Sequence, residues 1–230
     1  AARSERDTLS DIDLHIPSGS VVGILGGTGS GKSTLARLIM GIEKPISGQI
    51  LFDGQDITEL GITERAGLGI SFAFQQPVRF KGIRVQDLLR MAAGKNLSVS
   101  AACAYLSEVG LCARDYIDRE INSSLSGGEL KRIEIATLMA RHTKLSVFDE
   151  PEAGIDLWSF QNLIRIFEKM RSEIEDSSIV IISHQERILQ IADEIVVLAD
   201  GRITGRGKPD EVLPELIGKN APASICQKLQ

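Results

Sequence analysis

The fold of this chain is most constrained by one glycine-rich segment, residues 26–33, which reads GGTGSGKS and matches the pattern GxxxxGK[ST]. The segment follows an apolar run at residues 21–25 and precedes helical spacing of apolar residues at 33–40. Glycines let successive backbone N–H groups turn inward around phosphate oxygens, and the following helix adds the positive end of its dipole. We therefore expect a strand, a phosphate-binding loop and a helix in succession. The alternative is a glycine-rich turn with an incidental lysine.

This segment, which we call the phosphate loop, predicts a site for ATP and Mg²⁺. Lys32 is expected to contact the β- and γ-phosphates, and Ser33 to offer its hydroxyl to Mg²⁺. The residues expected to bind the nucleotide here are Gly26, Gly27, Thr28, Gly29, Ser30, Gly31, Lys32, Ser33 and Thr34.

Size and composition limit the remaining possibilities. The 230 residues fit one domain, with room for an inserted subdomain, and the hydrophobic fraction of 43% is ordinary for a globular protein. A net charge of −5 argues against nucleic acid as a partner. No apolar run is long enough for direct membrane insertion, and no signal segment opens the chain. These features predict a cytoplasmic protein, or one held at a membrane by a partner.

The cysteines are few and widely separated. Cys103, Cys112 and Cys226 include no CxxC pair, so they form neither a disulfide framework nor a zinc site. We expect reduced structural thiols.

The order of apolar patterns predicts an α/β fold. The predicted strands lie at residues 21–25, 69–74, 145–148 and 179–182, with hairpins at 48–57 and 194–203. The predicted helices lie at 33–40, 85–93, 100–109, 129–140, 157–174 and 187–192, and Pro209 opens a last one. This is a P-loop core with a mostly parallel sheet, an antiparallel β subdomain and an inserted helical subdomain. We expect a single domain over 1–230, with a nucleotide-binding core at 1–82 and 143–230 and the helical subdomain at 83–142.

Two strand ends carry candidate catalytic side chains. Asp149 and Glu150 follow the apolar strand at 145–148, where ligands bind in open α/β sheets. Asp149 suits Mg²⁺, and Glu150 is placed to polarise an attacking water. The alternative is a solvated strand end before Pro151. His184 follows the next strand and is expected to contact the γ-phosphate, unless it is merely structural.

Residues 125–129, which read LSGGE, form a second candidate anion site. They precede a helix that is expected to begin near Glu129, so the N–H groups of this stretch point at a ligand position. Taken alone, the same residues also fit a capped helix start with flexible glycines.

Together these features resemble the ATP-binding cassette (ABC) ATPases over nearly the whole chain. The matching segments, in order, are the phosphate loop at 26–33, Gln75, the signature segment at 125–129, the acidic strand at 145–150, the D-loop at 153–156 and His184.

The resemblance implies an ATPase that works as a head-to-tail homodimer formed on ATP. Ser126, Gly127 and Gly128 would then complete the ATP site of the partner copy. Gln75 would sense Mg²⁺ or the attacking water, serving as both a catalytic and a metal-site residue, and Asp156 would lie at the dimer contact. The family's adenine-stacking aromatic cannot be placed, because no aromatic residue precedes Phe52. We therefore expect the natural N-terminus to lie upstream of residue 1.

Two branches of the family fit the local sequence. Residues 73–78 with Gly82, and Glu129 with Lys131 and Arg132, look like the SufC-type ATPase of iron–sulfur cluster assembly, whose partner is a SufB/SufD-like scaffold. Pro151 departs from the bacterial SufC pattern. The alternative is the energy subunit of a membrane importer, whose partner is a permease. A DNA-repair member is excluded because Gln75 and residue 125 are too close for a long coiled coil.

Both branches require a surface for the partner. The resemblance places it at residues 77–89, where Phe80 and Ile83 are apolar in a loop-like setting. We expect these two side chains to contact the partner, with packing into the local core as the alternative.

Overall fold

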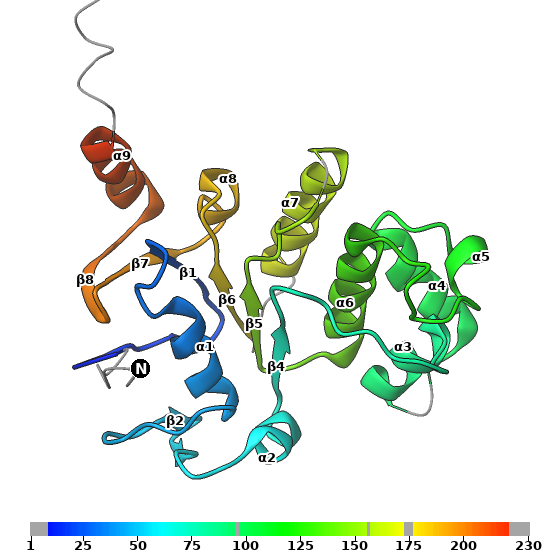
Figure 1. The fold of residues 1–230 in the computed structure, drawn as a ribbon, viewed down its shortest axis with the longest axis horizontal. Helices are drawn as coiled ribbons and strands as arrows, with labels where there is room; N and C mark the ends of the chain where they lie inside the picture. Colours follow the sequence, from blue (N-terminus) through cyan, green and yellow to red (C-terminus); the bar gives the residue numbers. More distant parts are fainter. Residues whose placement is uncertain (1–8, 95–96, 156, 173–176, 221–230) are drawn as a thin grey trace, which may run out of the picture.

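The computed structural model describes residues 9–94, 97–155, 157–172 and 177–220. Its centre is a six-stranded sheet in the order β4-β5-β6-β1-β7-β8, parallel except for β8 (Figure 1). The strands of this sheet are β1 (Val21–Gly26), β4 (Ile70–Ala73), β5 (Leu145–Asp149), β6 (Ser178–Ile182), β7 (Glu194–Ala199) and β8 (Arg202–Gly207). A separate antiparallel pair consists of β2 (Leu51–Phe52) and β3 (Gln55–Asp56).

The helices lie around and beyond this sheet. They are α1 (Lys32–Met40), α2 (Ile62–Gly67), α3 (Val85–Ala93), α4 (Val99–Glu108), α5 (Ala113–Tyr116), α6 (Gly127–Arg141), α7 (Leu157–Ser172), α8 (Glu186–Leu189) and α9 (Pro209–Asn220). Helices α3 to α6 gather at one end of the molecule, past the β4 edge of the sheet and far from β8 (Figure 1). The chain thus places one helical block beside the edge strand that precedes Gln75.

The two faces of the sheet pack into separate cores, as a buried parallel sheet requires. Alternate residues of β6 show this division. Ile179 and Ile181 belong to the cluster that includes α6 and α7, whereas Val180 and Ile182 belong to the cluster under α1. Every residue of β6 is buried, so its continuous apolar sequence is explained by burial on both faces.

The strand register brings the candidate site together. Ile24 of β1 pairs with Ile182 of β6, and Ile182 also pairs with Asp149 at the end of β5. Parallel strands end at the same edge, so the segments that leave β1, β4, β5 and β6 meet there. The phosphate loop, Gln75, Glu150 and His184 all follow these strand ends.

The predicted fold class is confirmed: the sheet is mostly parallel, with a small antiparallel sheet beside it. Two short helices, α2 and α5, were not anticipated, because four to six residues carry too little periodicity to read. The helix predicted to begin near Glu129 begins two residues earlier, at Gly127, since Ser126 caps it. The helix predicted at 187–192 spans only Glu186–Leu189.

Three expectations fall on residues that the structure does not describe: residues 173–174 of the helix predicted at 157–174, Asp156 and Cys226. Cys103 and Cys112 are free cysteines. Within the part of the chain that the structure describes, no helix is both long and apolar enough to cross a bilayer.

Candidate active site

The phosphate loop is held tightly between β1 and α1. Gly31 is the N-cap of α1 with φ of 104°, a left-handed conformation that favours glycine. A Cβ on Gly26 would lie 2.2 Å from the carbonyl oxygen of Leu198, so only glycine lets the loop pass this close to β7. The Ser30 hydroxyl is buried and has no hydrogen-bond partner among the described residues. An unsatisfied buried hydroxyl in such a cradle fits a site that a phosphate group completes.

Lys32 points back over the loop that precedes it. Its Nζ donates to the carbonyl oxygens of Gly26 (2.7 Å) and Gly27 (2.8 Å). An ammonium group has three N–H donors, so one is left for a phosphate oxygen as far as the described residues go. Burial lowers the pKa of Lys32, and the carboxylates of Glu150 and Asp149 oppose that effect.

Asp149 ends β5 as a buried carboxylate. Burial raises its pKa and the nearby Glu150 carboxylate raises it further, whereas a hydrogen bond from the Ser33 side chain lowers it. A hydroxyl and a carboxylate side by side form the oxygen-rich donor set that Mg²⁺ prefers. Ser33 and Asp149 therefore fit a Mg²⁺ ion, whose charge would compensate the buried carboxylate.

Glu150 turns away from Asp149 because its backbone is left-handed, with φ of 46°. Its carboxylate accepts a hydrogen bond from Nε2 of Gln75 at 2.5 Å, and the other oxygen lies 3.1 Å from Nε2 of His184. The structure thus brings together the three residues predicted to be catalytic. A non-glycine residue in this region pays roughly 1–3 kcal/mol of strain, and such strain clusters at functional sites.

Glu152 is a site residue that the sequence reasoning missed. Its carboxylate accepts a hydrogen bond from the Ser183 hydroxyl at 2.6 Å and from the backbone N–H of His184 at 3.3 Å. It therefore fixes the turn that presents His184. The only sequence signal was a third acidic residue close behind Asp149 and Glu150, and spacing alone does not show what that residue contacts.

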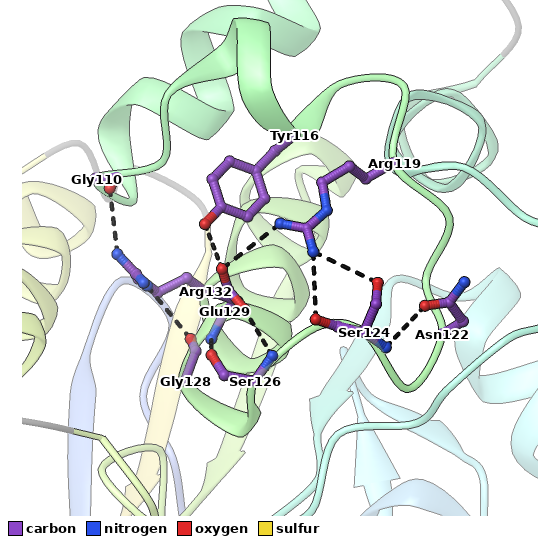
Figure 2. A network of polar contacts seen from close by, with 9 residues as sticks. All are labelled: Gly110, Tyr116, Arg119, Asn122, Ser124, Ser126, Gly128, Glu129 and Arg132. Carbon is purple, nitrogen blue, oxygen red and sulfur yellow. Dashed lines mark hydrogen bonds and ion pairs between the residues drawn. The ribbon is translucent and has the colours of Figure 1, made fainter.

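The signature segment forms a reciprocal cap on α6. The Ser126 hydroxyl accepts from the Glu129 N–H (3.2 Å), and the Glu129 carboxylate accepts from the Ser126 N–H (2.6 Å), as Figure 2 shows. This capping box uses the N–H groups of Ser126 and Glu129. The N–H groups of Gly127 and Gly128, between them, take no part in it and remain suited to an anion.

Two residues of the helical block hold the Glu129 carboxylate in place (Figure 2). The Tyr116 hydroxyl donates to it, and Arg119 lies 3.7 Å away as an ion pair. The Tyr116 hydrogen bond, with the Ser126 N–H next in importance, lowers the pKa of Glu129 to about 2. Neither Tyr116 nor Arg119 was a candidate from sequence, because they lie in and after the unanticipated helix α5.

The signature segment also lies beside the D-loop of its own chain. A Cβ on Gly128 would be 3.9 Å from the carbonyl oxygen of Gly154. In the region predicted to receive a partner, Phe80 is 37% exposed, whereas Ile83 is half-buried and packs against the core. Local packing therefore accounts for Ile83 but not for Phe80.

Comparisons with known proteins agree on one family. The model of the ABC transporter family matches residues 9–153. An uncharacterized ABC transporter ATP-binding protein of Methanocaldococcus jannaschii is 36% identical, over 91% of this chain and 86% of the relative. The sulfate/thiosulfate import ATP-binding protein CysA of Bacillus cereus is 33% identical over 89% of this chain, which spans only 58% of CysA.

A solved structure points to the same family. The chain resembles cbiO1 of Clostridium perfringens, part of the ABC transporter complex cbiONQ, with a TM-score of 0.74 and 31% identity. The likeness covers 92% of this chain and 87% of cbiO1.

Proposed function

The chain belongs to the ABC transporter family and is an ATPase of that family, and from this premise we propose that it is the energy subunit of a membrane importer. The ATPase part of the proposal is carried by the convergence of Gln75 and His184 on Glu150, whose carboxylate acts electrostatically on Lys32 of the phosphate loop. The importer part is carried by the relatives. Among its relatives, CysA is named for sulfate and thiosulfate import, and cbiO1 is part of a transporter complex.

We assign the hydrolytic step as follows. Glu150 accepts a proton from water as the water oxygen bonds to the γ-phosphorus. The bond from that phosphorus to the oxygen shared with the β-phosphate breaks, and ADP leaves, while Gln75 and His184 keep the Glu150 carboxylate oriented. Lys32 contacts the β- and γ-phosphates, and the Ser33 hydroxyl and Asp149 are the groups that would hold Mg²⁺. When bound, Mg²⁺ neutralises charge that develops on the phosphate oxygens. His184, oriented by Glu152, approaches the γ-phosphate.

The second half of each site comes from a second copy in this proposal. Gly127 and Gly128 offer backbone N–H groups, and Ser126 its hydroxyl, to the γ-phosphate bound by the partner copy. Residues 1–82 and 143–230 serve as the nucleotide-binding core, and residues 83–142 as the helical subdomain that carries the signature segment. Asp156 is assigned to the dimer contact.

A SufC-like role with a SufB/SufD-like scaffold is the second candidate. The feature that favours it is Glu129, an ionised carboxylate held by Tyr116 where the family usually has glutamine. The names of the relatives given above refer to transport and not to iron–sulfur assembly. The importer reading is therefore preferred.

Affinity capture from a detergent-treated whole-cell extract of the native organism, which contains both membrane and soluble proteins, separates the two candidates. An integral membrane permease in stoichiometric amount supports the importer, whereas a soluble scaffold with no permease overturns it in favour of the SufC-like role. Phe80→Asp should abolish capture, because Phe80 is an exposed apolar side chain in the predicted partner surface. Met91→Asp is the matched control, since Met91 is 60% exposed outside residues 77–89.

A further inference from the structure

A buried ion pair on α6 faces the segment that carries Gln75. Nζ of Lys131 lies 3.1 Å from Oε2 of Glu134, with the side chains 1% and 15% exposed. Burying two charges removes their hydration, so such a pair adds little net stability compared with apolar side chains of the same size. The pair thus needs an explanation other than stability.

Both members of this pair hold the same residue, Phe74. The Lys131 ammonium donates to the Phe74 carbonyl, and the Glu134 carboxylate accepts from the Phe74 N–H at 3.0 Å. Phe74 directly follows β4 and directly precedes Gln75. Both backbone hydrogen-bonding groups of the residue before Gln75 are therefore tied to α6.

The contacts continue in both directions from Phe74. On one side, the Gln75 amide donates to the Glu150 carboxylate at 2.5 Å. On the other, α6 begins at the cap formed by Ser126. A single rigid helix thus connects the signature segment to the neighbour of Gln75. The charge of Lys131 also reaches Asp149, where it opposes the effect of burial on the pKa of that carboxyl.

We propose that Lys131 and Glu134 are positioning residues that couple the signature segment to Gln75 of the same chain. The inference rests on the proposed function, which assigns the signature segment to the partner's ATP site and Gln75 to the chain's own. When the signature segment engages the partner's ATP, α6 shifts and carries Phe74 with it. The Gln75 amide then moves relative to Glu150, so closure at one site reaches the hydrolytic residues of the other.

An apolar replacement of the whole pair separates positioning from folding. The double variant Lys131→Met with Glu134→Leu removes both charges together and so leaves no unpaired buried charge. Phe74 is 37% exposed, so water can take over its two lost backbone hydrogen bonds, and the variant should melt close to the wild-type temperature. We expect kcat for ATP hydrolysis to fall about tenfold while KM stays within about twofold, because nucleotide contacts are intact and coupling is lost. The matched control is Glu108→Gln, which breaks the partly exposed ion pair between Glu108 and Lys169 and should leave kcat unchanged.

Amide hydrogen exchange gives a readout that does not depend on turnover. In chains that also carry Glu150→Gln, Mg²⁺-ATP should raise protection in residues 70–76 and 125–135 together. When the Lys131→Met and Glu134→Leu changes are added to these chains, only residues 125–135 should gain protection. A folded double variant with wild-type kcat, or with both segments still responding together, overturns the coupling and leaves the proposed function intact. A wild-type chain that neither hydrolyses ATP nor dimerises on it overturns both.

Discussion

At the scale of single residues, Asp149 and Glu150 show how two adjacent carboxylates acquire different chemistry. Asp149 still belongs to β5 and is buried, so its pKa is raised, and a hydrogen bond from Ser33 accompanies it. Glu150 takes a left-handed backbone and extends its carboxylate to Gln75 and His184. Asp149 lies where a cation would offset its charge, and Glu150 lies where it can accept a proton.

Replacing Glu150 by glutamine should test its role as the base. Glu150→Gln keeps the shape and a hydrogen-bond acceptor but removes the proton acceptor, so kcat should fall about 10²–10⁴-fold with little change in KM. Phosphate release under steady-state conditions measures both constants. Hydrolysis at the wild-type rate would assign the base elsewhere, and Glu152→Gln is then the variant to examine next.

Replacing Asp149 by asparagine should stabilise the nucleotide-free chain. The folded pKa of Asp149 is raised above 3.8, so the unfolded state releases this proton at lower pH than the folded state does. The stability that this group contributes is fully present below the unfolded pKa and is lost as pH rises through the folded pKa. At neutral pH the ionised Asp149 therefore destabilises the folded state. Asp149→Asn should raise Tm by about 2–4 °C.

Thermal melting at two pH values checks this prediction. The gain in Tm from Asp149→Asn should be present at pH 7 and disappear in acid, below the unfolded pKa. Adding Mg²⁺ and ATP should then stabilise wild type more than the variant, since the variant lacks the carboxylate that we propose binds Mg²⁺. A variant that melts lower than wild type at pH 7 would mean that Asp149 is stabilising in its ionised form.

At the scale of elements, the start of α6 combines a helix cap with a ligand position. The Ser126 hydroxyl and the Glu129 carboxylate accept from the N–H groups of Glu129 and Ser126, which leaves the N–H groups of Gly127 and Gly128 for an anion. The sequence showed the small residues, but the helix was expected to begin two residues late. Only the reciprocal bonds between Ser126 and Glu129 fix its true start.

Two variants of Glu129 should distinguish how much its helix-capping hydrogen bond and its charge each contribute to stability. Glu129→Ala removes the capping box and should lower the free energy of unfolding by about 1–2 kcal/mol. Glu129→Gln keeps a neutral acceptor for the Ser126 N–H and should cost less. Since the folded pKa of Glu129 is depressed to about 2, its charge contributes stability above the unfolded value of 4.5, and that contribution is lost as pH falls toward 2.

Denaturant unfolding across this pH range provides the measurement. The difference in free energy of unfolding between wild type and Glu129→Gln should be largest above pH 4.5 and become smaller below it. Tyr116→Phe should shrink it as well at neutral pH, because Tyr116 is the main cause of the depressed pKa. A difference that does not change with pH would show that the ionised form of Glu129 has no special stability in the fold.

The elements also show what local sequence can and cannot determine. Strands β5 and β6 were predicted because each is a short, mostly apolar run, and the structure buries both of them on both faces. The phosphate loop was predicted because its glycines are needed for local geometry. The sequence did not predict three contacts: Tyr116 with Glu129, Glu152 with Ser183, and Lys131 with Phe74. Each contact joins residues that only the folded topology brings together.

At the scale of the whole molecule, the proposed site is divided between two copies, which a mixing experiment can test. Lys32→Met removes the ammonium group that is proposed to bind phosphate, and Gly127→Asp places a carboxylate where the signature segment should meet phosphate. A Cβ on Gly127 has no atom of the described residues within 4 Å, so the second change should leave the monomer fold intact. Each variant alone should have little ATPase activity.

Mixing the two variants should restore activity. A heterodimer places both defects in one site and leaves the other with a normal phosphate loop and a normal signature segment. At equal amounts and random pairing, half of the dimers are mixed, so about a quarter of all sites are intact and about a quarter of wild-type activity should return. If the signature segment served its own chain instead, every site would keep one defect and mixing would restore nothing. Phosphate release from the mixture, measured against each variant alone, therefore distinguishes a shared site from two separate ones.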